Sequence, residues 1–321
     1  MTGTAQVPSG IAAFYDRNLL ERAIPALVHD KWGQMRNLPK GNSDSVKFRR
    51  WNALATATTP LTEGTTPTGS NMSVTDVTAT ILQYGDFTTL TDKVSLVTED
   101  NVIKEATDVL GEQGGETLDE VCRDILVAGT SVVYAGATVT PTIDTRVEVA
   151  AAVTTADLDV CIKTLKGQNA KKFTQMVTGT TKVGTAPIKA AYVGICHTDT
   201  SETLETLTGW TGAEAYASST LIDMNEIGSY KYVRFIETTM GKIFAGAGAG
   251  AVDVYGTLIF GKNAYGVVSL RGQKNIETIV KPLGSSGTAD PLNQRATVGW
   301  KAWTITKILN DNFMVRLESA E

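Results

Sequence analysis

The sequence predicts an α+β fold in which a few helices accompany many strands. Two segments, residues 99–128 and 154–167, repeat apolar residues at helical spacing. Several other stretches alternate apolar and polar residues or are rich in β-branched and aromatic residues, which is typical of strands. This mixture indicates an α+β fold, and the chain contains no internal repeat.

The first expected element is a helix over residues 11–24. Pro25 ends it, because proline disfavours helical geometry in the residue before it. A lone helix of this length is marginal in water, and apolar side chains such as Phe14 and Leu20 need a surface to bury against. We therefore expect this segment to dock on another surface.

An extended β-hairpin is expected next. Residues 45–51 alternate apolar with charged or polar side chains, and residues 74–97 are rich in β-branched and aromatic residues, as in strands. Between them, residues 53–73 are dominated by Thr, Pro, Gly and Ala. A two-stranded arm is marginal alone and usually needs a partner surface, which is a first indication of assembly.

A long helix is expected over residues 99–128, about 40 Å in length. Its apolar residues share one face, and the charged residues supply a solvated face. Glu99 and Asp100 lie where the helix dipole favours negative charge. Gly111, Gly114 and Gly115 weaken the middle, so a kink or break is expected there.

The second half of the chain reads as shorter elements. Thr154 and Asp157 are placed to cap a helix that ends at Gly167. The other expected elements are a buried strand at 190–196, a short helix at 201–207, a strand at 230–237, a Gly-Ala loop at 246–250, and mostly strand at 252–270 and 300–317, separated by turns at 282–291.

Composition and charge favour a globular protein whose charge is unevenly distributed. Of the 321 residues, 42% are apolar and 20% are charged, and the formal net charge of −5 gives no strong attraction to nucleic acid. Residues 1–50 carry eight Lys/Arg and four Asp/Glu, whereas residues 51–130 carry three against thirteen. We hypothesise that basic residues such as Arg49 and Arg50 pair with acids of residues 99–124 on a neighbouring copy.

No active site is recognisable. Cys122, Cys161 and Cys196 are widely spaced, which argues against disulfides and a zinc site, and each is expected to be a small buried residue. His197 beside Cys196 is expected to be structural, because adjacent strand residues point to opposite faces. His29 is expected to be a surface or arm residue. No catalytic residue, metal ligand or cofactor is therefore assigned, and the chain is not expected to be an enzyme.

The targeting signals and the one basic cluster give weaker indications. Residues 1–10 lack a signal-peptide layout, and no apolar run is long enough to cross a bilayer, so we expect a protein made in a reducing cytoplasm with no membrane partner. A basic, aromatic cluster could grip nucleic acid, but packing at an interface is the favoured interpretation, because a dedicated binder normally has a basic domain. The cluster comprises Arg36, Lys40, Lys47, Phe48, Arg49, Arg50 and Trp51.

With these elements in place, their order resembles the major capsid proteins of tailed bacteriophages, in the branch related to the coat protein of podovirus N4. The matching stretches include Phe14-Tyr15-Asp16, residues 19–25, residues 46–51, Pro60-Leu61-Thr62-Glu63-Gly64, residues 83–87, Thr91-Asp92-Lys93, Thr117-Leu118-Asp119, residues 234–238, residues 290–294 and Gly299-Trp300-Lys301. They extend over most of the chain, and their co-occurrence in this order is more specific than any one of them.

The resemblance implies the coat fold shared by tailed phages and herpesvirus shells, with an N-terminal arm, a β-hairpin called the E-loop, a long spine helix, and peripheral and axial domains. The expected boundaries are 1–40 for the arm, 41–97 for the E-loop and its strands, 98–150 for the spine helix and peripheral domain, 151–275 for a largely axial domain, and 276–321 for strands that return to the peripheral domain.

The expected function is therefore structural. Copies would form pentamers and hexamers that close an icosahedral shell around double-stranded DNA, without sequence-specific DNA binding. Portal, scaffold or cementing proteins are further possible partners, and the expected location is the virion capsid, with the host cytoplasm before assembly. A bacterial nanocompartment shell and a hydrolase with an unrecognised site are the alternatives. The residues expected at the assembly interface are Phe14, Leu20, Phe48, Arg49, Arg50, Trp51, Tyr84 and Phe87.

Overall fold

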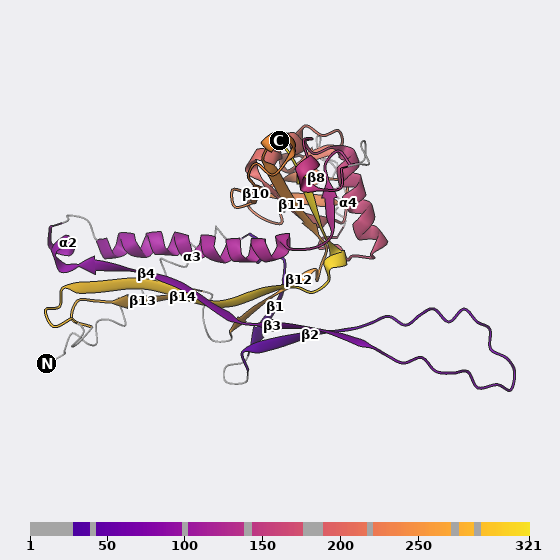
Figure 1. Cartoon of the computed structure of the whole chain (residues 1–321), viewed down its shortest axis with the longest axis horizontal. Helices are drawn as coiled ribbons and strands as arrows, with labels where there is room; N and C mark the ends of the chain where they lie inside the picture. The colour runs from indigo at the N-terminus through magenta and orange to yellow at the C-terminus, as the bar shows by residue number, and fades with distance from the viewer. Residues whose placement is uncertain are drawn as a thin grey trace.

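A computed structural model describes residues 28–38, 43–97, 102–137, 143–175, 189–216, 221–270, 276–285 and 290–321. Two sheets organise these residues, and one long helix connects them (Figure 1). An elongated sheet lies beside the helix, a compact sheet with further helices lies at the helix's C-terminal end, and a thin hairpin projects away from both. Helices and strands are mixed as the sequence predicts, and the α+β class is confirmed.

The elongated sheet has five strands, and β14 (Arg295–Ile308) is its longest. One edge of β14 pairs with β4 (Leu82–Thr91). The other edge pairs first with β13 (Glu277–Lys281) and then with β12 (Tyr265–Leu270). Strand β1 (Gln34–Leu38) adds to β12 in parallel, so the segment that follows the N-terminal residues is part of this sheet.

The expected hairpin is present. β2 (Ser45–Trp51) pairs antiparallel with β3 (Val74–Thr80), and residues 52–73 between them form no regular element. The base of the hairpin packs on the elongated sheet, where Phe48 and Ala79 join Val268 in a small apolar cluster. Beyond this base the hairpin extends away from the body of the molecule (Figure 1).

The predicted strand over residues 74–97 ends earlier than expected. Strand β4 stops at Thr91, and Asp92–Val97 form a short helix, α2. Asp92 explains the change, because its carboxylate accepts a hydrogen bond from the backbone N–H of Lys93 at 2.7 Å and starts the helical turn. The β-branched residues that follow were therefore a poor guide to conformation here.

The long helix α3 (Val102–Val127) is continuous, contrary to the kink or break expected near its glycines. Its 26 residues span about 39 Å. Gly114 lies against the indole of Trp300 on β14, and a Cβ at this position would lie 3.3 Å from that ring. The glycines thus allow close packing of helix on sheet, which offsets their poor helix propensity. Arg316 closes the far end by donating to the carbonyl oxygens of Val127 and Gly129.

The compact sheet has eight strands, and three of them are buried along their whole length. Their order is β5 (Val132–Tyr134), β15 (Met314–Ser319), β11 (Val254–Phe260), β6 (Tyr192–His197), β9 (Val233–Thr238), β8 (Glu226–Tyr230) and β7 (Trp210–Gly212), with β10 (Lys242–Phe244) paired to β11. Short 3-10 turns at Arg146–Glu148, Ala213–Ala215, Ala249–Ala251 and Asp311–Phe313 complete the described elements.

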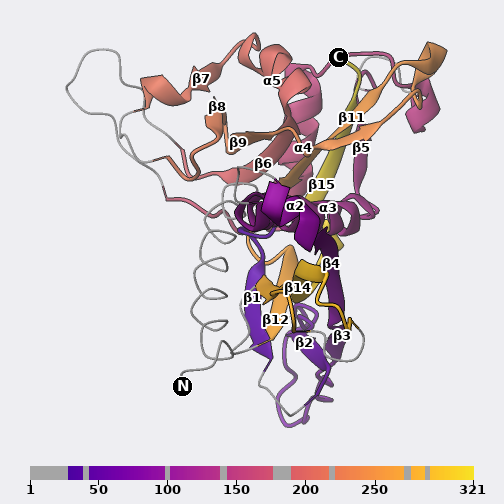
Figure 2. The ribbon, with the colours of Figure 1, turned by 90° about the vertical axis from the view of Figure 1, so that its left-hand side faces the viewer.

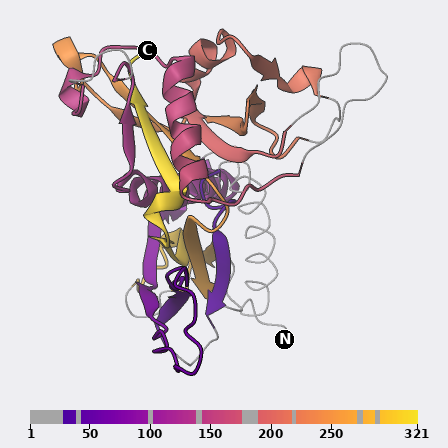
Figure 3. The same ribbon diagram turned by 90° about the vertical axis from the view of Figure 1, so that its right-hand side faces the viewer.

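Helices cover one face of this sheet, and the end of α3 reaches the other. Helix α4 (Thr155–Gly167) lies beside helix α5 (Thr198–Glu205) (Figure 3). It buries Leu158, Cys161 and Leu165 in an apolar core on this face of the sheet. Thr154 caps α4 as the sequence predicts, through a reciprocal hydrogen-bonded box with Asp157. A separate apolar core lies on the opposite face of the sheet and contains Leu126 of α3.

Sheet membership does not follow the expected domain boundaries. Strand β5 lies within residues 98–150 but belongs to the compact sheet. Strand β12 lies within residues 151–275 but belongs to the elongated sheet. Strand β15 lies within residues 276–321 but belongs to the compact sheet. The expected single strand at 230–237 is also divided, because Lys231 has a φ of 49° and turns the chain between β8 and β9. A turn at this lysine was not signalled by glycine or proline.

Candidate assembly interface

The hairpin presents apolar side chains to solvent along its length. Every residue from Trp51 to Asp76 is exposed. Four large apolar side chains in this stretch are more than half exposed, with exposed fractions of 59% for Trp51, 52% for Leu54, 79% for Leu61 and 66% for Met72, and Val74 is 37% exposed. A projecting loop with this many exposed apolar side chains is typical of a surface that is buried by a partner.

Polar contacts within the hairpin hold its two strands in register. Arg49 donates to both carboxylate oxygens of Asp76 opposite, at 2.9 and 3.0 Å. The hydrogen bond from Arg49 is the main reason that the pKa of Asp76 lies below its ordinary value. Asn52 and Ser73 continue the ladder by one backbone and one side-chain hydrogen bond. The hairpin is therefore ordered at its base and presents Arg50, rather than Arg49, without a partner among the described residues.

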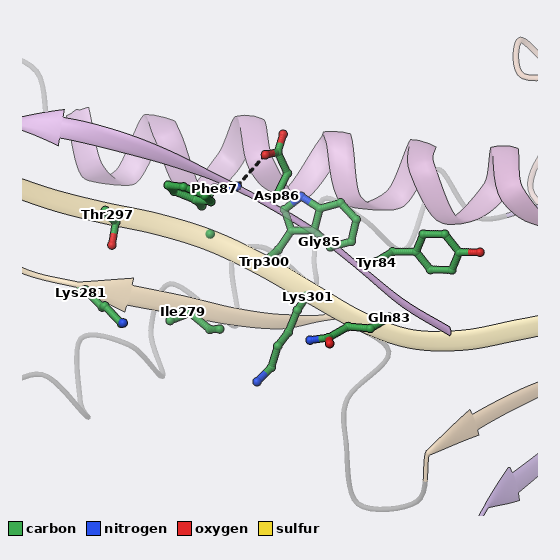
Figure 4. A pocket seen from close by; sticks show the side chains of 11 residues that line it. Gln83, Tyr84, Gly85, Asp86, Phe87, Ile279, Lys281, Thr297, Trp300 and Lys301 are labelled. Carbon is green, nitrogen blue, oxygen red and sulfur yellow. Dashed lines mark hydrogen bonds between the residues drawn. The ribbon is translucent and has the colours of Figure 1, made fainter. Parts of the chain in front are cut away.

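A hollow lies on the face of the elongated sheet that points away from α3 (Figure 4). Its volume is about 620 Å³. Gly299 of β14 lies between Phe87 of β4 and Ile279 of β13, and a Cβ on this glycine would lie 2.8 Å from Cβ of Phe87. Phe87 itself is 68% exposed. The missing side chain creates a depression with an aromatic wall, which suits an apolar side chain from another molecule.

The other face of the same strands packs against α3 and is closed. The ring nitrogen of Trp300 donates to the side-chain oxygen of Gln113, and Gln113 donates to Asp86 at 2.8 Å. The hydrogen bond from Gln113, followed by that from the backbone N–H of Phe87, lowers the pKa of Asp86. One face of the sheet thus packs against the helix, and the hollow lies on the opposite face.

The predicted interface residues fall into three groups. Arg49, Arg50, Trp51 and Phe87 are exposed, and the first three lie on the hairpin. Phe48 and Tyr84 are partly buried within their own chain, under the hairpin and beside α3. Phe14 and Leu20 lie outside the described residues. The structure therefore places the exposed members on two separate surfaces, the hairpin and the hollowed sheet face.

His29 is a buried anchor and not the surface residue that the sequence suggests. Its ring and Asp119 of α3 are 1% and 0% exposed, and the backbone N–H groups of Val28 and His29 both donate to the same carboxylate at 2.8 Å. The hydroxyl of Tyr265 donates to the carbonyl oxygen of His29. These contacts fix the chain at residues 28 and 29 to helix α3.

A cluster of lysines around one aromatic ring was missed by the sequence analysis. The ammonium groups of Lys166, Lys172 and Lys189 lie 3.6, 4.1 and 5.1 Å from the ring centre of Tyr232. Lys231 forms an ion pair with Asp159 beside them. These residues are far apart in the sequence and meet only through the β8–β9 turn and the end of α4, so no local pattern reveals them.

The described residues offer structural rather than catalytic roles for the candidate chemical groups. The three cysteines are free and buried as predicted, and burial raises the pKa of the Cys161 thiol to about 12. His197 caps α5 by accepting from the backbone N–H of Asp199, a structural role. No group of three or more metal-ligating side chains occurs in the described ranges. None of the helices described there is both long and apolar enough to span a bilayer.

Of two sequence comparisons with known proteins, one gives a match. The model of a family described as phage capsid protein matches residues 73–317, which include the second hairpin strand, α3 and most of both sheets. A comparison with curated protein sequences gives no match.

Solved phage capsids share the fold. The chain is similar to the capsid of Ralstonia phage GP4, with a TM-score of 0.65 and 14% identity over 89% of this chain and 86% of that chain. It is similar to the capsid of cyanophage Pam1, with a TM-score of 0.62 and 17% identity over 93% and 92%. For cyanophage P-SCSP1u the values are 0.58 and 11% over 92% and 88%.

Proposed function

The chain belongs to the phage capsid protein family, and we propose from this premise that its copies assemble through pentamers and hexamers into an icosahedral shell around double-stranded DNA. Its function is structural and not enzymatic, and it acts in the virion capsid. Neither a nanocompartment shell nor a hydrolase is favoured by this family membership. A closed shell fits a protein that reuses the same few interfaces in every copy.

The observation that carries this proposal is the projecting hairpin. Its tip buries no side chain against its own chain, and four of its large apolar residues are exposed. Fully burying one such side chain is worth roughly 1.5–3 kcal/mol, so a partner surface would gain several kcal/mol from the tip. We propose that the hairpin is the E-loop and that it lies over a neighbouring copy.

The hollowed sheet face is the surface that we propose receives it. This hollow is lined by Phe87, Ile279 and the small residue Gly299, and it is open to solvent. The exposed side chains of the hairpin, Trp51 and Leu61 among them, are of the size and polarity that such a depression accepts. The hairpin and the hollow lie on different parts of one chain. The contact therefore joins unlike surfaces of two copies and repeats around a ring.

The domain names follow the same proposal. We assign residues 1–40 to the arm, 41–97 to the E-loop and its strands, 98–150 to the spine helix and peripheral domain, 151–275 to a largely axial domain, and 276–321 to the return strands. β12 is grouped with the peripheral sheet and β15 with the axial sheet, following their pairing. We further propose the branch related to the coat protein of podovirus N4, supported by the sequence stretches that match it.

Packaged DNA is proposed to contact the shell weakly and without sequence preference. The formal net charge of −5 opposes tight binding to phosphate. Portal, scaffold or cementing proteins are proposed as additional partners, and the host cytoplasm as the site of synthesis.

A shortened hairpin tests the proposed role of the tip. Replacing residues 53–72 with Asn-Gly joins Asn52 to Ser73 by a two-residue turn that suits the antiparallel pairing of β2 and β3. We expect a folded subunit with an unchanged melting temperature that forms no shells by electron microscopy. The matched control, Thr65→Ser with Thr66→Ser, keeps the full tip and should assemble. Normal shells from the shortened chain would reject this role for the hairpin.

A further inference from the structure

A basic groove lies at the base of the hairpin, distinct from the hollow on the sheet. Its volume is about 570 Å³, and its walls come from β1, β2 and the connection that follows β14. The apolar side chains Phe48, Leu309 and Phe313 contribute to its lining. Four cationic side chains also line it, namely Arg36, Lys47, Arg49 and Arg50, and none of its lining residues, all within the described ranges, is acidic.

Asp76, across the hairpin, lies near Lys47 but forms its ion pair with Arg49. Arg49 is held in a two-point ion pair by Asp76. Arg36, Lys47 and Arg50 are exposed, and they come from two strands that do not pair with each other. The concentration of like charge in a concave site is unfavourable alone and favours an anionic occupant.

A complementary acidic surface runs along α3. Glu105, Glu112, Glu116 and Glu120 are exposed and follow one another at intervals of seven, four and four residues, so they form a single stripe about 22 Å long. Val109 lies within this stripe and is 63% exposed. Glu120 is already paired with Arg123 at 2.9 Å. The stripe thus offers the carboxylates of Glu105 and Glu116 beside an apolar side chain, and the groove offers cations around apolar side chains.

The groove and the stripe cannot meet within one chain, because the elongated sheet separates them (Figures 1 and 2). Successive residues of a strand point to opposite faces. On β14, Val298 and Trp300 pack under α3, whereas Ile305 faces the hairpin cluster. On β12, Val268 faces the hairpin. Helix and hairpin therefore cover opposite faces of the same sheet, and the acidic stripe is on the solvent side of the helix.

We propose that the groove at the base of the hairpin binds the acidic stripe of α3 from a second copy of this chain. The proposal rests on the proposed shell function and names one contact that builds the shell. It joins two unlike surfaces, so the same contact repeats from copy to copy and closes a ring when the rotation allows. Arg49 is already paired with Asp76. We therefore propose that Arg36, Lys47 and Arg50, rather than Arg49, contact the neighbouring copy.

Paired charge reversals test the contact. Arg36→Glu with Arg50→Glu should reduce shell formation about ten-fold or more, and Glu105→Lys with Glu116→Lys should do the same. Combining all four should restore it, because the signs again oppose. Lys163→Glu with Lys171→Glu, which lie outside the groove and the stripe, is the matched control and should assemble normally. Melting temperatures of all variants report folding, and negative-stain particle counts report assembly.

Each outcome decides the proposal. Shells from either reversed pair at the wild-type level, no recovery in the combined variant, or equal loss in the control would overturn the contact while leaving the shell function intact. Absence of shells from the wild-type chain, measured in parallel, would instead overturn the proposed function itself.

Discussion

Nδ1 of His29 lies 2.7 Å from Oδ2 of Asp119, and both side chains are buried. The other carboxylate oxygen of Asp119 accepts the backbone N–H groups of Val28 and His29. The Asp119 side chain of α3 therefore binds three groups of the segment that enters β1: two backbone N–H groups and the imidazole of His29. This contact fixes the segment that enters β1 to helix α3.

Removing this carboxylate should release the entering segment. Asp119→Ala leaves two backbone N–H groups and a buried imidazole without partners, which we expect to cost about 3–5 kcal/mol of unfolding free energy. Limited proteolysis should then cut near Val28 before the rest of the chain. The exposed Glu116→Ala on the same helix is the control and should change stability by less than about 0.5 kcal/mol. Equal stability of the two variants would contradict the anchoring role.

The same pair predicts an acid dependence with a definite sign. Burial opposes the ionisation of Asp119, but the hydrogen bonds and charge of His29 outweigh it, so its pKa lies below the ordinary value of 3.8. A lowered acid stabilises the fold above its unfolded pKa, and this contribution is lost as pH falls through the folded value. The difference in unfolding free energy between wild type and Asp119→Ala should therefore be full at pH 6 and shrink below pH 4. A difference that grows on acidification would refute the assignment.

Asp30 beside this pair should behave in the opposite way. Burial, followed by repulsion from Asp119, raises its pKa above 3.8. Its ionised form is therefore disfavoured in the folded chain, and the stability available while it is protonated is lost as pH rises through its folded pKa. Asp30→Asn should raise the melting temperature at pH 7 and have little effect at pH 3. A lower melting temperature at pH 7 would show that its carboxylate is needed.

Close packing at Gly114 gives a test of helix against sheet. Ile276 and the ring of Trp300 lie 3.4 and 3.3 Å from the position of a Cβ, so a larger side chain must displace the indole. Gly114→Val should destabilise the chain by about 1–3 kcal/mol or more in chemical denaturation. Gly167→Ala at the end of α4, where a Cβ meets no atom within 4 Å, should be neutral or stabilising. Similar effects at both glycines would mean that helix propensity alone matters.

Phe87 separates assembly from folding. Because this side chain is 68% exposed, Phe87→Asp should leave the melting temperature of the subunit nearly unchanged and reduce shell yield. Met224→Asp is the control, since Met224 is 95% exposed and does not line the hollow. Light scattering during assembly measures both variants. Unchanged scattering from Phe87→Asp would remove the hollow from the interface.

Much of the fold was predictable because local patterns specify its elements. The hairpin strand Ser45–Trp51 and the capped helix that ends at Gly167 agree with their expected bounds, since alternation and capping residues are local signals. The family resemblance supplied the overall fold. Membership in the phage capsid protein family and the similarity to solved phage capsids confirm this fold. The continuous helix through Gly114 was not predictable, because it depends on packing against the distant Trp300. The turn at Lys231 was not predictable because no glycine or proline marks it.

The candidate surfaces were predictable only in part, because they depend on which face each residue occupies. Trp51 and Phe87 are exposed as an interface requires, whereas Phe48 and Tyr84 face their own chain. The sequence revealed the separation of basic and acidic segments, but the ion pair of Arg49 with Asp76 requires the strand register. Long-range pairings such as His29 with Asp119 leave no local pattern and require the three-dimensional structure.

Electron microscopy of the purified full-length chain, concentrated with a crowding polymer, tests the central claim most directly. The account predicts closed, uniform, hollow particles tens of nanometres across, built from rings of five and six copies. The same sample should contain few free subunits above the assembly concentration. A chain that stays monomeric, or forms a discrete small oligomer under every such condition, would contradict the claim that it builds a shell from copies of itself.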